Sequence, residues 1–468
     1  MKKTRTKKKT ESKRKKGQMV QLPELRARAA GIDIGSEEIF VAVPPTFDPE
    51  PVRKFGAFTA DLLQIAEWLL AHQITTVAME STGVYWIPLY DVLEERGIEV
   101  YLVNAAHAKN VPGRSTDVSD CQWLQFLHSV GLLRDSFHPA QQIRALRDVR
   151  RHRENLVAMA AEHILHMQKA LDLMNLQLHR VISDLTGVTG MSIVQAILDG
   201  ERDPKKLALL RDPNIRATPE IIEKSLTGNY QQQHLFILKQ ALDAYRYYQR
   251  QIFDCDEVIK QLISKLPSKI DPQEHPIPPA RNRHKKRQGN EYHFDMRGEM
   301  YRVYGVDLTQ VPSIGTSLVA ALYTEIGENL KTDFPAASNF SSWMGFCPAH
   351  EISGGKVLSR KTRKVPSRLA QAFRMCAQAL NKSQSALGDY YRRMRARLGA
   401  PKAITAAAHK LARIVYHMVT TREPYKESIF EQWDEARLKQ QKAKLVRQAR
   451  KMGFLLTPIT PTTSAVVP

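Results

Sequence analysis

The chain has 468 residues, with 69 Lys and Arg against 48 Asp and Glu, which gives a formal net charge of +21 and a pI near 9.7. An excess of this sign favours a nucleic-acid partner, because each phosphate that a basic side chain neutralises releases condensed counterions. Four cysteines without a C-x-x-C pair suggest neither a zinc site nor a disulfide framework, and the lack of a run of about 18 apolar residues argues against a membrane protein.

The N-terminal segment is the most basic part of the chain. Residues 1–16 contain ten Lys or Arg and one acid, Glu11. With so little apolar surface to bury, residues 1–27 are expected to form a basic disordered tail. About twelve positive charges remain in surplus over the body of the chain, so the expectation of nucleic acid does not depend on the tail. We expect a cytoplasmic, nucleoid-associated protein of a bacterial or archaeal cell, since no signal-peptide core is evident.

Residues 28–135 alternate between strand-like and helix-like patterns, which predicts an α/β domain. Short apolar runs rich in β-branched residues predict strands at 31–34, 39–44, 75–79 and 99–103. Helical periodicity lies between them, at 62–72 and 90–97.

The rest of the chain is predicted to be mainly helical. Residues 136–268 contain two long helical stretches with few breakers, which indicate paired helices or a coiled coil used for assembly. A Pro-rich, basic stretch at 269–298 is predicted to be a linker or an insertion. A second compact, mainly α-helical unit is expected at 299–430, and a C-terminal helix with a disordered tail at 431–468.

Four carboxylates are the candidate catalytic residues of the first domain. Asp33 lies in the apolar context GIDIG, Glu80 ends the run TTVAM, and Asp117 and Asp120 are spaced i, i+3 where a helix is predicted to begin. A single acid at such a place is more often a helix cap or a solvated charge. An unpaired carboxylate in an apolar context is costly, however, and hard oxygen ligands suit Mg²⁺, so the four together predict a magnesium site able to support phosphodiester cleavage.

The motifs GIDIG, MESTGVYW and GRSTDVSD resemble, in this order, the N-terminal RuvC-like DEDD domain of transposases of the IS110 family of insertion sequences. The resemblance implies an RNase H-like fold whose acids hold magnesium. Ser115 stands where the family has a lysine and Cys121 where it has an alanine. Arg114 could stand in for that lysine and contact nucleic acid.

Two later segments, VPSIGTSLVAALYTEIG and NFSSWMGFCPAHEISGGK, resemble the hairpin and the serine motif of the C-terminal transposase domain of the same family. The resemblance implies that Ser353 is the nucleophile. Taken alone, Ser-Gly-Gly is usually a loop and VPSIG a helix start. A glycine-bounded loop would nonetheless let the serine reach a phosphate, although the sequence does not identify its general base. The basic residues expected to contact nucleic acid here are Lys356, Arg360, Lys361, Arg363 and Lys364.

The resemblance further implies a DNA recombinase with a composite active site, in which acids and serine come from different protomers of a dimer or tetramer. The serine would form a covalent phosphoserine link to DNA. A non-coding bridge RNA would pair with double-stranded donor and target DNA.

Three alternatives stay open. One is a RuvC-type, Mg²⁺-dependent junction resolvase in which Ser353 is incidental. Another is an actin-like sugar kinase, since such enzymes also begin with a GIDIGS-like segment followed by strands. The function of a sugar kinase would not explain the net charge of +21. The last is a protein that binds nucleic acid without catalysis, in which case Asp33 and Glu80 would be dispensable.

Overall fold

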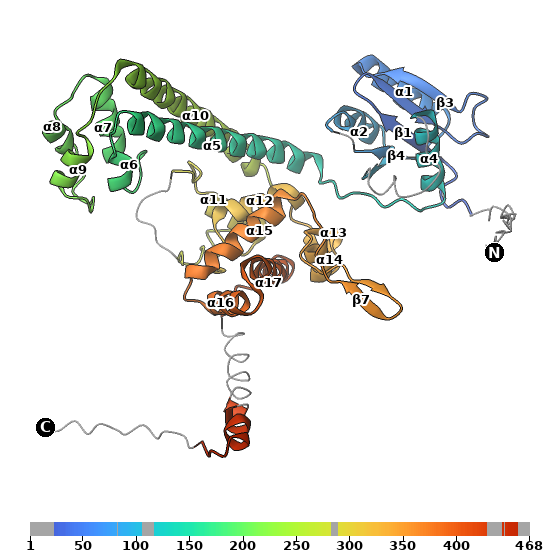
Figure 1. The fold of residues 1–468 in the computed structure, drawn as a ribbon. Helices are drawn as coiled ribbons and strands as arrows, with labels where there is room; N and C mark the ends of the chain where they lie inside the picture. The colour runs from blue at the N-terminus through green and yellow to red at the C-terminus, as the bar shows by residue number, and fades with distance from the viewer. Residues whose placement is uncertain are drawn as a thin grey trace, which may run out of the picture. The chain divides into compact units, whose positions relative to one another are not determined.

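The chain forms two compact units, Met1–His138 and Pro139–Pro468, in a computed structural model (Figure 1). The structure describes residues 23–81, 83–104, 117–281, 289–427, 442–443 and 445–456, without the side chains of 117–119 and 351. The basic stretch 1–16 and the predicted site residue Arg114 therefore lie outside the described residues.

The first unit is a mixed α/β domain built on a five-stranded sheet with the order β3-β2-β1-β4-β5. Strand β2 pairs antiparallel with both β1 and β3, β4 runs parallel to β1, and β5 runs parallel to β4. The elements of this unit are β1 (Ala29–Ile34), β2 (Glu38–Ala42), β3 (Val52–Gly56), α1 (Thr59–Ala71), β4 (Thr76–Glu80), α2 (Trp86–Glu95), β5 (Glu99–Val103) and α4 (Asp117–Ser129).

All four predicted strands are present, as β1, β2, β4 and β5, and both predicted helices are present as α1 and α2. The fifth strand, β3, was not predicted. It is an edge strand with no fully buried residue, so its sequence, VRKFG, lacks the apolar run that marks the other strands.

The two faces of the sheet carry different helices. Alternate residues of β1 and β4, such as Ile32 and Met79, join a core with α1 and α2. The opposite face packs on α4, where Ala78 of β4 lies in a core with Leu124 and Leu127. The sheet is thus covered on both sides.

Gly31 allows α4 to approach β1 closely. A Cβ atom at this position would lie 2.2 Å from the carbonyl oxygen of Cys121 and 2.3 Å from the amide nitrogen of Gln125. At the other end of α4, the His128 Nε2 atom is 2.9 Å from Thr76 Oγ1, at the start of β4. Helix α4 therefore runs antiparallel to β4, and its N-terminus lies toward the carboxyl ends of the parallel strands.

The second unit is mostly helical, with one two-stranded sheet. Among its described residues the elements are α5 (Gln141–Leu173), α6 (Leu178–Val181), α7 (Val188–Leu198), α8 (Pro204–Ala208), α9 (Pro219–Ser225), α10 (Gln232–Ser264), α11 (Met296–Tyr304), η1 (Leu308–Gln310), α12 (Thr316–Ile326), α13 (Leu330–Asp333), α14 (Ala337–Trp343), β6 (Glu351–Ser353), β7 (Lys356–Ser359), α15 (Arg368–Ala379), η2 (Leu380–Lys382), α16 (Ala386–Leu398) and α17 (Ala400–Thr421). None of the described helices is long and apolar enough to cross a bilayer.

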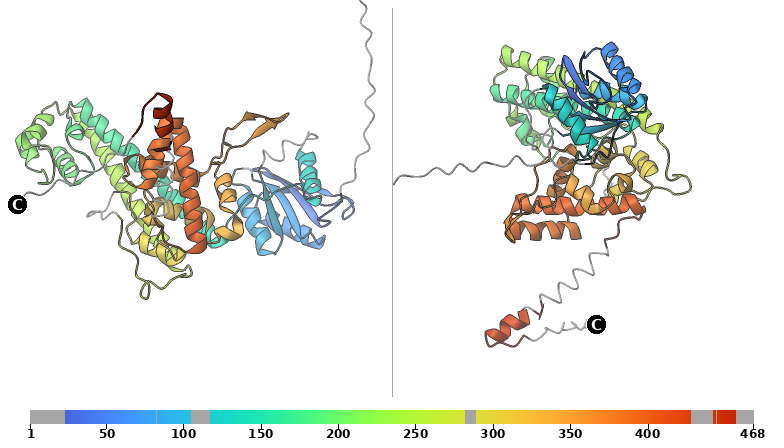
Figure 2. Two further views of the ribbon diagram at one scale, coloured as in Figure 1. Left: turned by 90° about the horizontal axis from the view of Figure 1, so that it is seen from below. Right: turned by 90° about the vertical axis from the view of Figure 1, so that its right-hand side faces the viewer.

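Helices α5 and α10 form a long antiparallel pair, side by side in both Figure 1 and Figure 2. Leu156 and Ala160 of α5 pack against Ile252 and Cys255 of α10, and the far end of the pair shares a core with α6 to α9. The N-terminal part of α5 also holds α12, because Arg147 donates hydrogen bonds of 3.1 Å to the carbonyl oxygens of both Thr324 and Glu325.

Candidate active site

Asp33 and Glu80 occupy neighbouring positions at the carboxyl ends of β1 and β4. The parallel pairing of the two strands ends at Ile32 with Met79, so Asp33 and Glu80 each follow the last paired residue. Side chains two residues apart on a strand lie on the same face of the sheet. Asp33 therefore shares the face of Gly31, and Glu80 shares the face of Ala78, which is the face that α4 covers. Glu80 is only 6% exposed.

The start of α4 adds further carboxylates at the same end of this face. Cys121 on α4 is fully buried, and the pKa of its thiol is raised to about 12, chiefly by burial and also by the nearby carboxylates of Asp33 and Asp120. Both acids thus lie near one sulfur atom. Positions 117, 120 and 124 are spaced three and four residues apart on α4, so Asp117 lies on the same helix face as Asp120 and the buried Leu124. The side chain of Asp117 is outside those described.

The donor set suits a hard divalent cation, because carboxylates from two strands and one helix lie on one face of the sheet, toward the same end. Within the described side chains, which leave out Asp117, no three acids, histidines or cysteines are grouped closely enough to hold a metal. Asp33, Glu80 and Asp120 all have interactions with neighbouring groups. The residues fit a metal by chemistry and by placement on one face.

Ser353 is the last residue of β6, directly before a tight turn. Gly354 and Gly355 have φ angles of 54° and 75°, as a type I′ turn requires, and Ser353 pairs with Lys356 across the hairpin. The sequence predicted a glycine-bounded loop at this place. The structure shows that this loop is the two-residue turn of a β-hairpin, because both glycines adopt positive φ. Ser353 and Lys356 are both exposed and share one face.

The base of the hairpin is fixed to the helical body. The Ala349 amide donates to the carbonyl oxygen of Lys361 (2.9 Å), and Arg363 donates to the carbonyl oxygen and hydroxyl of Ser342 at the end of α14 (2.8 and 3.1 Å). Arg363 thus anchors the hairpin. The other predicted basic residues of this segment, Lys356, Arg360, Lys361 and Lys364, are exposed.

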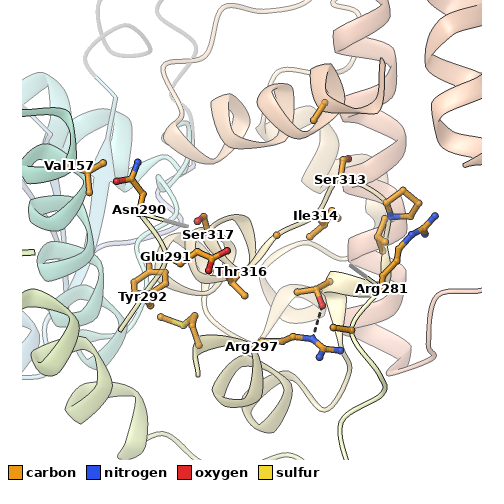
Figure 3. Close-up of a pocket in the computed structure, with 18 of the residues that line it drawn as sticks. Val157, Arg281, Asn290, Glu291, Tyr292, Arg297, Ser313, Ile314, Thr316 and Ser317 are labelled. Carbon is orange, nitrogen blue, oxygen red and sulfur yellow. Dashed lines mark hydrogen bonds between the residues drawn. The ribbon is translucent and has the colours of Figure 1, made fainter. Parts of the chain in front are cut away.

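The second predicted motif, VPSIG, forms the turn into α12. Ser313 has a φ of 69°, and Gly315 is the N-cap residue of α12. This turn lines a cleft of about 1740 Å³ between the α5–α10 pair and α11 with α12 (Figure 3).

The walls of this cleft are held by hydrogen bonds. Arg297 donates to Thr309 Oγ1 (3.0 Å), and Arg153 of α5 donates to the carbonyl oxygen of Asn290 (3.2 Å). Two lining residues, Arg281 and Gly289, flank a strongly basic stretch of sequence, 282–288, that lies outside the described residues.

Two transposase family models match the chain. Residues 30–176 match the DEDD domain of IS110 transposases, described as "Transposase", and residues 307–392 match the model described as "Transposase IS116/IS110/IS902 family". The chain belongs to the IS110 family of transposases. It is accordingly a DNA transposase or recombinase. No curated protein matches it.

The two matched regions of this transposase contain the predicted catalytic residues. The first includes the four acids, and a DEDD domain suggests the use of a divalent metal. The second includes the VPSIG turn and the hairpin with Ser353. The acids belong to the first compact unit and the serine to the second.

Two features of the candidate site were missed in the sequence, although each has a recognisable pattern. The place of Lys356 opposite Ser353 follows from Gly-Gly between two short β-prone runs, which is a hairpin signal. The role of Gly31 follows from its position two residues before Asp33, where a side chain would block the helix that carries the other acids.

Proposed function

We propose that this transposase cuts and rejoins DNA with two groups of residues, the carboxylates Asp33, Glu80, Asp117 and Asp120 and the nucleophile Ser353. The observation that carries the proposal is the shared face and shared end of Asp33, Glu80 and the start of α4. We further propose that the first unit has an RNase H-like (RuvC-like) fold, supported by acids on its first strand, a later strand and a following helix.

In the proposed reaction the Ser353 hydroxyl loses its proton as Oγ bonds to phosphorus. One P–O bond of the DNA breaks, and the released strand end takes up a proton to become a hydroxyl. Rejoining is the reverse reaction with the hydroxyl of another strand, so the phosphodiester energy is retained in the phosphoserine link. Lys356, paired with Ser353 across the hairpin, would stabilise the charge that develops on the phosphate.

The carboxylates would hold Mg²⁺, which when bound supplies positive charge to phosphate oxygens. Asp33 and Glu80 would orient this cation from the two rigid strands, and α4 would add Asp117 and Asp120. Because α4 and the core beneath it cover this face, Glu80 is largely shielded from water.

The nucleophile is tested by Ser353→Ala with Ser359→Ala, in the same hairpin, as the matched control. Full-length protein is incubated with Mg²⁺ and a labelled duplex from the DNA that flanks the gene, then denatured. We expect a protein–DNA adduct with wild type and Ser359→Ala and none with Ser353→Ala. Cleavage by Ser353→Ala at the wild-type rate, without any adduct, would instead support the junction-resolvase alternative.

The guide is proposed to be a non-coding bridge RNA that pairs with donor and target DNA. The net charge of +21 supports a large nucleic-acid load. RNA that co-purifies with the expressed protein and maps to the DNA beside the gene is the expected result. Purification of active protein free of RNA would contradict it.

A further inference from the structure

The hairpin formed by β6 and β7 exposes large apolar side chains. Ile352 is 63% exposed, Val357 42% and Leu358 69%. Ile352 and Val357 are cross-strand partners and so share a face, whereas Leu358 is the extra residue of a bulge. The hairpin projects from the helices of its own unit in Figures 1 and 2. Its apolar residues therefore face solvent beyond the helical body.

The hairpin is amphipathic, because side chains alternate between its two faces. Ser353 and Lys356 form a polar pair on one face, and Ile352 and Val357 form an apolar pair on the other. The nucleophile proposed above is thus adjacent in sequence to the apolar face. One residue advances a strand by about 3.3 Å, close to the rise of about 3.4 Å per base pair in DNA.

The positive charge of the segment indicates a nucleic-acid partner. Residues 352–364 contain five Lys or Arg and no acid. A positive segment of this kind attracts a polyanion, and two-stranded β-ribbons bind in the grooves of duplex DNA. Ile352 and Val357 cannot make favourable contacts with charged phosphates, whereas they can pack against the apolar faces of unstacked bases. Proteins that kink DNA insert such side chains between base steps.

We propose that the β6–β7 hairpin is a wedge for duplex DNA. Ile352 and Val357 pack against a base pair that is unstacked at a kinked step, while Ser353 and Lys356 meet the phosphate beside it. This inference rests on the proposed role of Ser353 as the nucleophile. The kink would expose the attacked phosphate and weaken the local duplex.

Chemical probing of base stacking tests the wedge with the full-length protein as purified. The probe is the duplex that flanks the gene, bound in the absence of divalent metal and treated with permanganate for thymines and diethyl pyrocarbonate for purines. The variant is Ile352→Thr/Val357→Thr, which keeps β-branched side chains and so the hairpin. Leu165→Gln, at a 62% exposed leucine of α5, is the matched control.

Wild type, Leu165→Gln and Ser353→Ala are expected to make one or two consecutive base pairs at least fivefold more reactive than in free DNA. The double threonine variant should return them to the free-DNA level while still shifting the duplex in a gel. Reactivity that persists in the double variant overturns the wedge. So does a wild-type complex without reactive bases, or the absence of any complex with the duplex.

The Ser353→Ala arm separates the two proposals. If Ser353→Ala cleaves DNA normally but the double variant alone loses the reactive bases, the nucleophile is wrong and the wedge stands. If Ser353→Ala forms no adduct and the reactive bases are unaffected by the double variant, the nucleophile stands and the wedge is wrong.

Discussion

Asp33 and Glu80 lie side by side at the carboxyl ends of two parallel strands, each one residue beyond the paired residues Ile32 and Met79. Two neighbouring carboxylates repel each other, and a divalent cation bound between them would remove this repulsion. The fold itself brings the two carboxylates together, because the strand register and the alternation of side chains put both of them on the same face of the sheet.

Removing either carboxylate should abolish strand cleavage and preserve DNA binding. For Asp33→Asn and Glu80→Gln we expect a loss of about 100-fold or more in cleavage rate, typical of groups that stabilise developing charge. Gel-shift affinity for duplex DNA should change less than about threefold. Glu38→Gln is the matched control, since Glu38 is an exposed carboxylate of the same sheet, paired with Lys54. A cleaving Asp33→Asn enzyme would mean that the carboxylates are dispensable.

Divalent metal should stabilise the first unit through the same carboxylates. A ligand that binds only the folded state raises the free energy of unfolding by RT ln(1 + [L]/Kd), about 2.7 kcal/mol at 100 times Kd. We expect added Mg²⁺ to raise the melting temperature of wild type but not of Asp33→Asn/Glu80→Gln, measured by calorimetry without DNA. Equal shifts in both proteins would place the metal elsewhere.

If the acids and the serine of one site come from different protomers, two inactive variants should complement each other. In a mixture of Asp33→Asn and Ser353→Ala proteins, a hybrid oligomer contains one site with both intact groups. We expect up to about one quarter of wild-type cleavage after subunit exchange and none from either variant alone. A mixture that stays inactive, although exchange is verified with differently tagged chains, would indicate a site within one protomer.

The sequence was sufficient for those elements whose signal is local. The apolar runs of β1, β2, β4 and β5 and the periodicity of α5 and α10 predicted the elements that carry the acids and the long helical pair. The edge strand β3 escaped because its half-exposed residues carry no such pattern.

Long-range contacts could not be predicted in the same way. The register that places Asp33 beside Glu80, and the close approach of α4 at Gly31, depend on tertiary packing between segments about 47 and 90 residues apart in sequence. The hairpin at Ser353 was missed for another reason. Its Gly-Gly pair was interpreted only as a loop, although two adjacent glycines between short β-prone runs are also typical of a two-residue hairpin turn.

Glu325 should be a major stabilising residue of the second unit. Its carboxylate accepts two hydrogen bonds from Arg151 (3.0 and 2.6 Å) and lies 3.8 Å from Arg147 and 4.0 Å from Arg150. Glu325→Gln leaves this cluster without its buried negative charge, so we expect a loss of about 3–5 kcal/mol in the free energy of unfolding. Urea unfolding followed by far-UV circular dichroism measures the loss.

The control for Glu325 is Asp243→Asn, which removes an exposed ion pair with Lys239 on α10. Its expected cost is about 0.5 kcal/mol or less, because solvent screens a surface pair. Similar losses of unfolding free energy in both variants would show that burial does not make the Glu325 cluster more stabilising than a surface ion pair.

His128 should make the first unit less stable in acid. It is fully buried on α4, 2.9 Å from Thr76 Oγ1, and burial, with the nearby Arg26 as a smaller cause, lowers its pKa to about 4. In the unfolded chain its pKa is near 6.5. Between these values the unfolded chain binds more protons, so the free energy of unfolding falls as the pH drops from about 6.5 to 4, by at most about 3 kcal/mol.

Carboxylates also titrate between about pH 4 and 6.5 and change the stability of the protein. The contribution of His128 is therefore measured as the difference in free energy of unfolding between wild type and His128→Gln. The stability advantage of wild type over this variant should be largest above pH 6.5 and should shrink steadily toward pH 4. Calorimetric scans of both proteins at half-unit pH steps measure it, with His417→Gln, at an exposed histidine of the other unit, as the control for loss of a histidine. An advantage that does not change with pH would mean that His128 is protonated equally in the folded and unfolded chains.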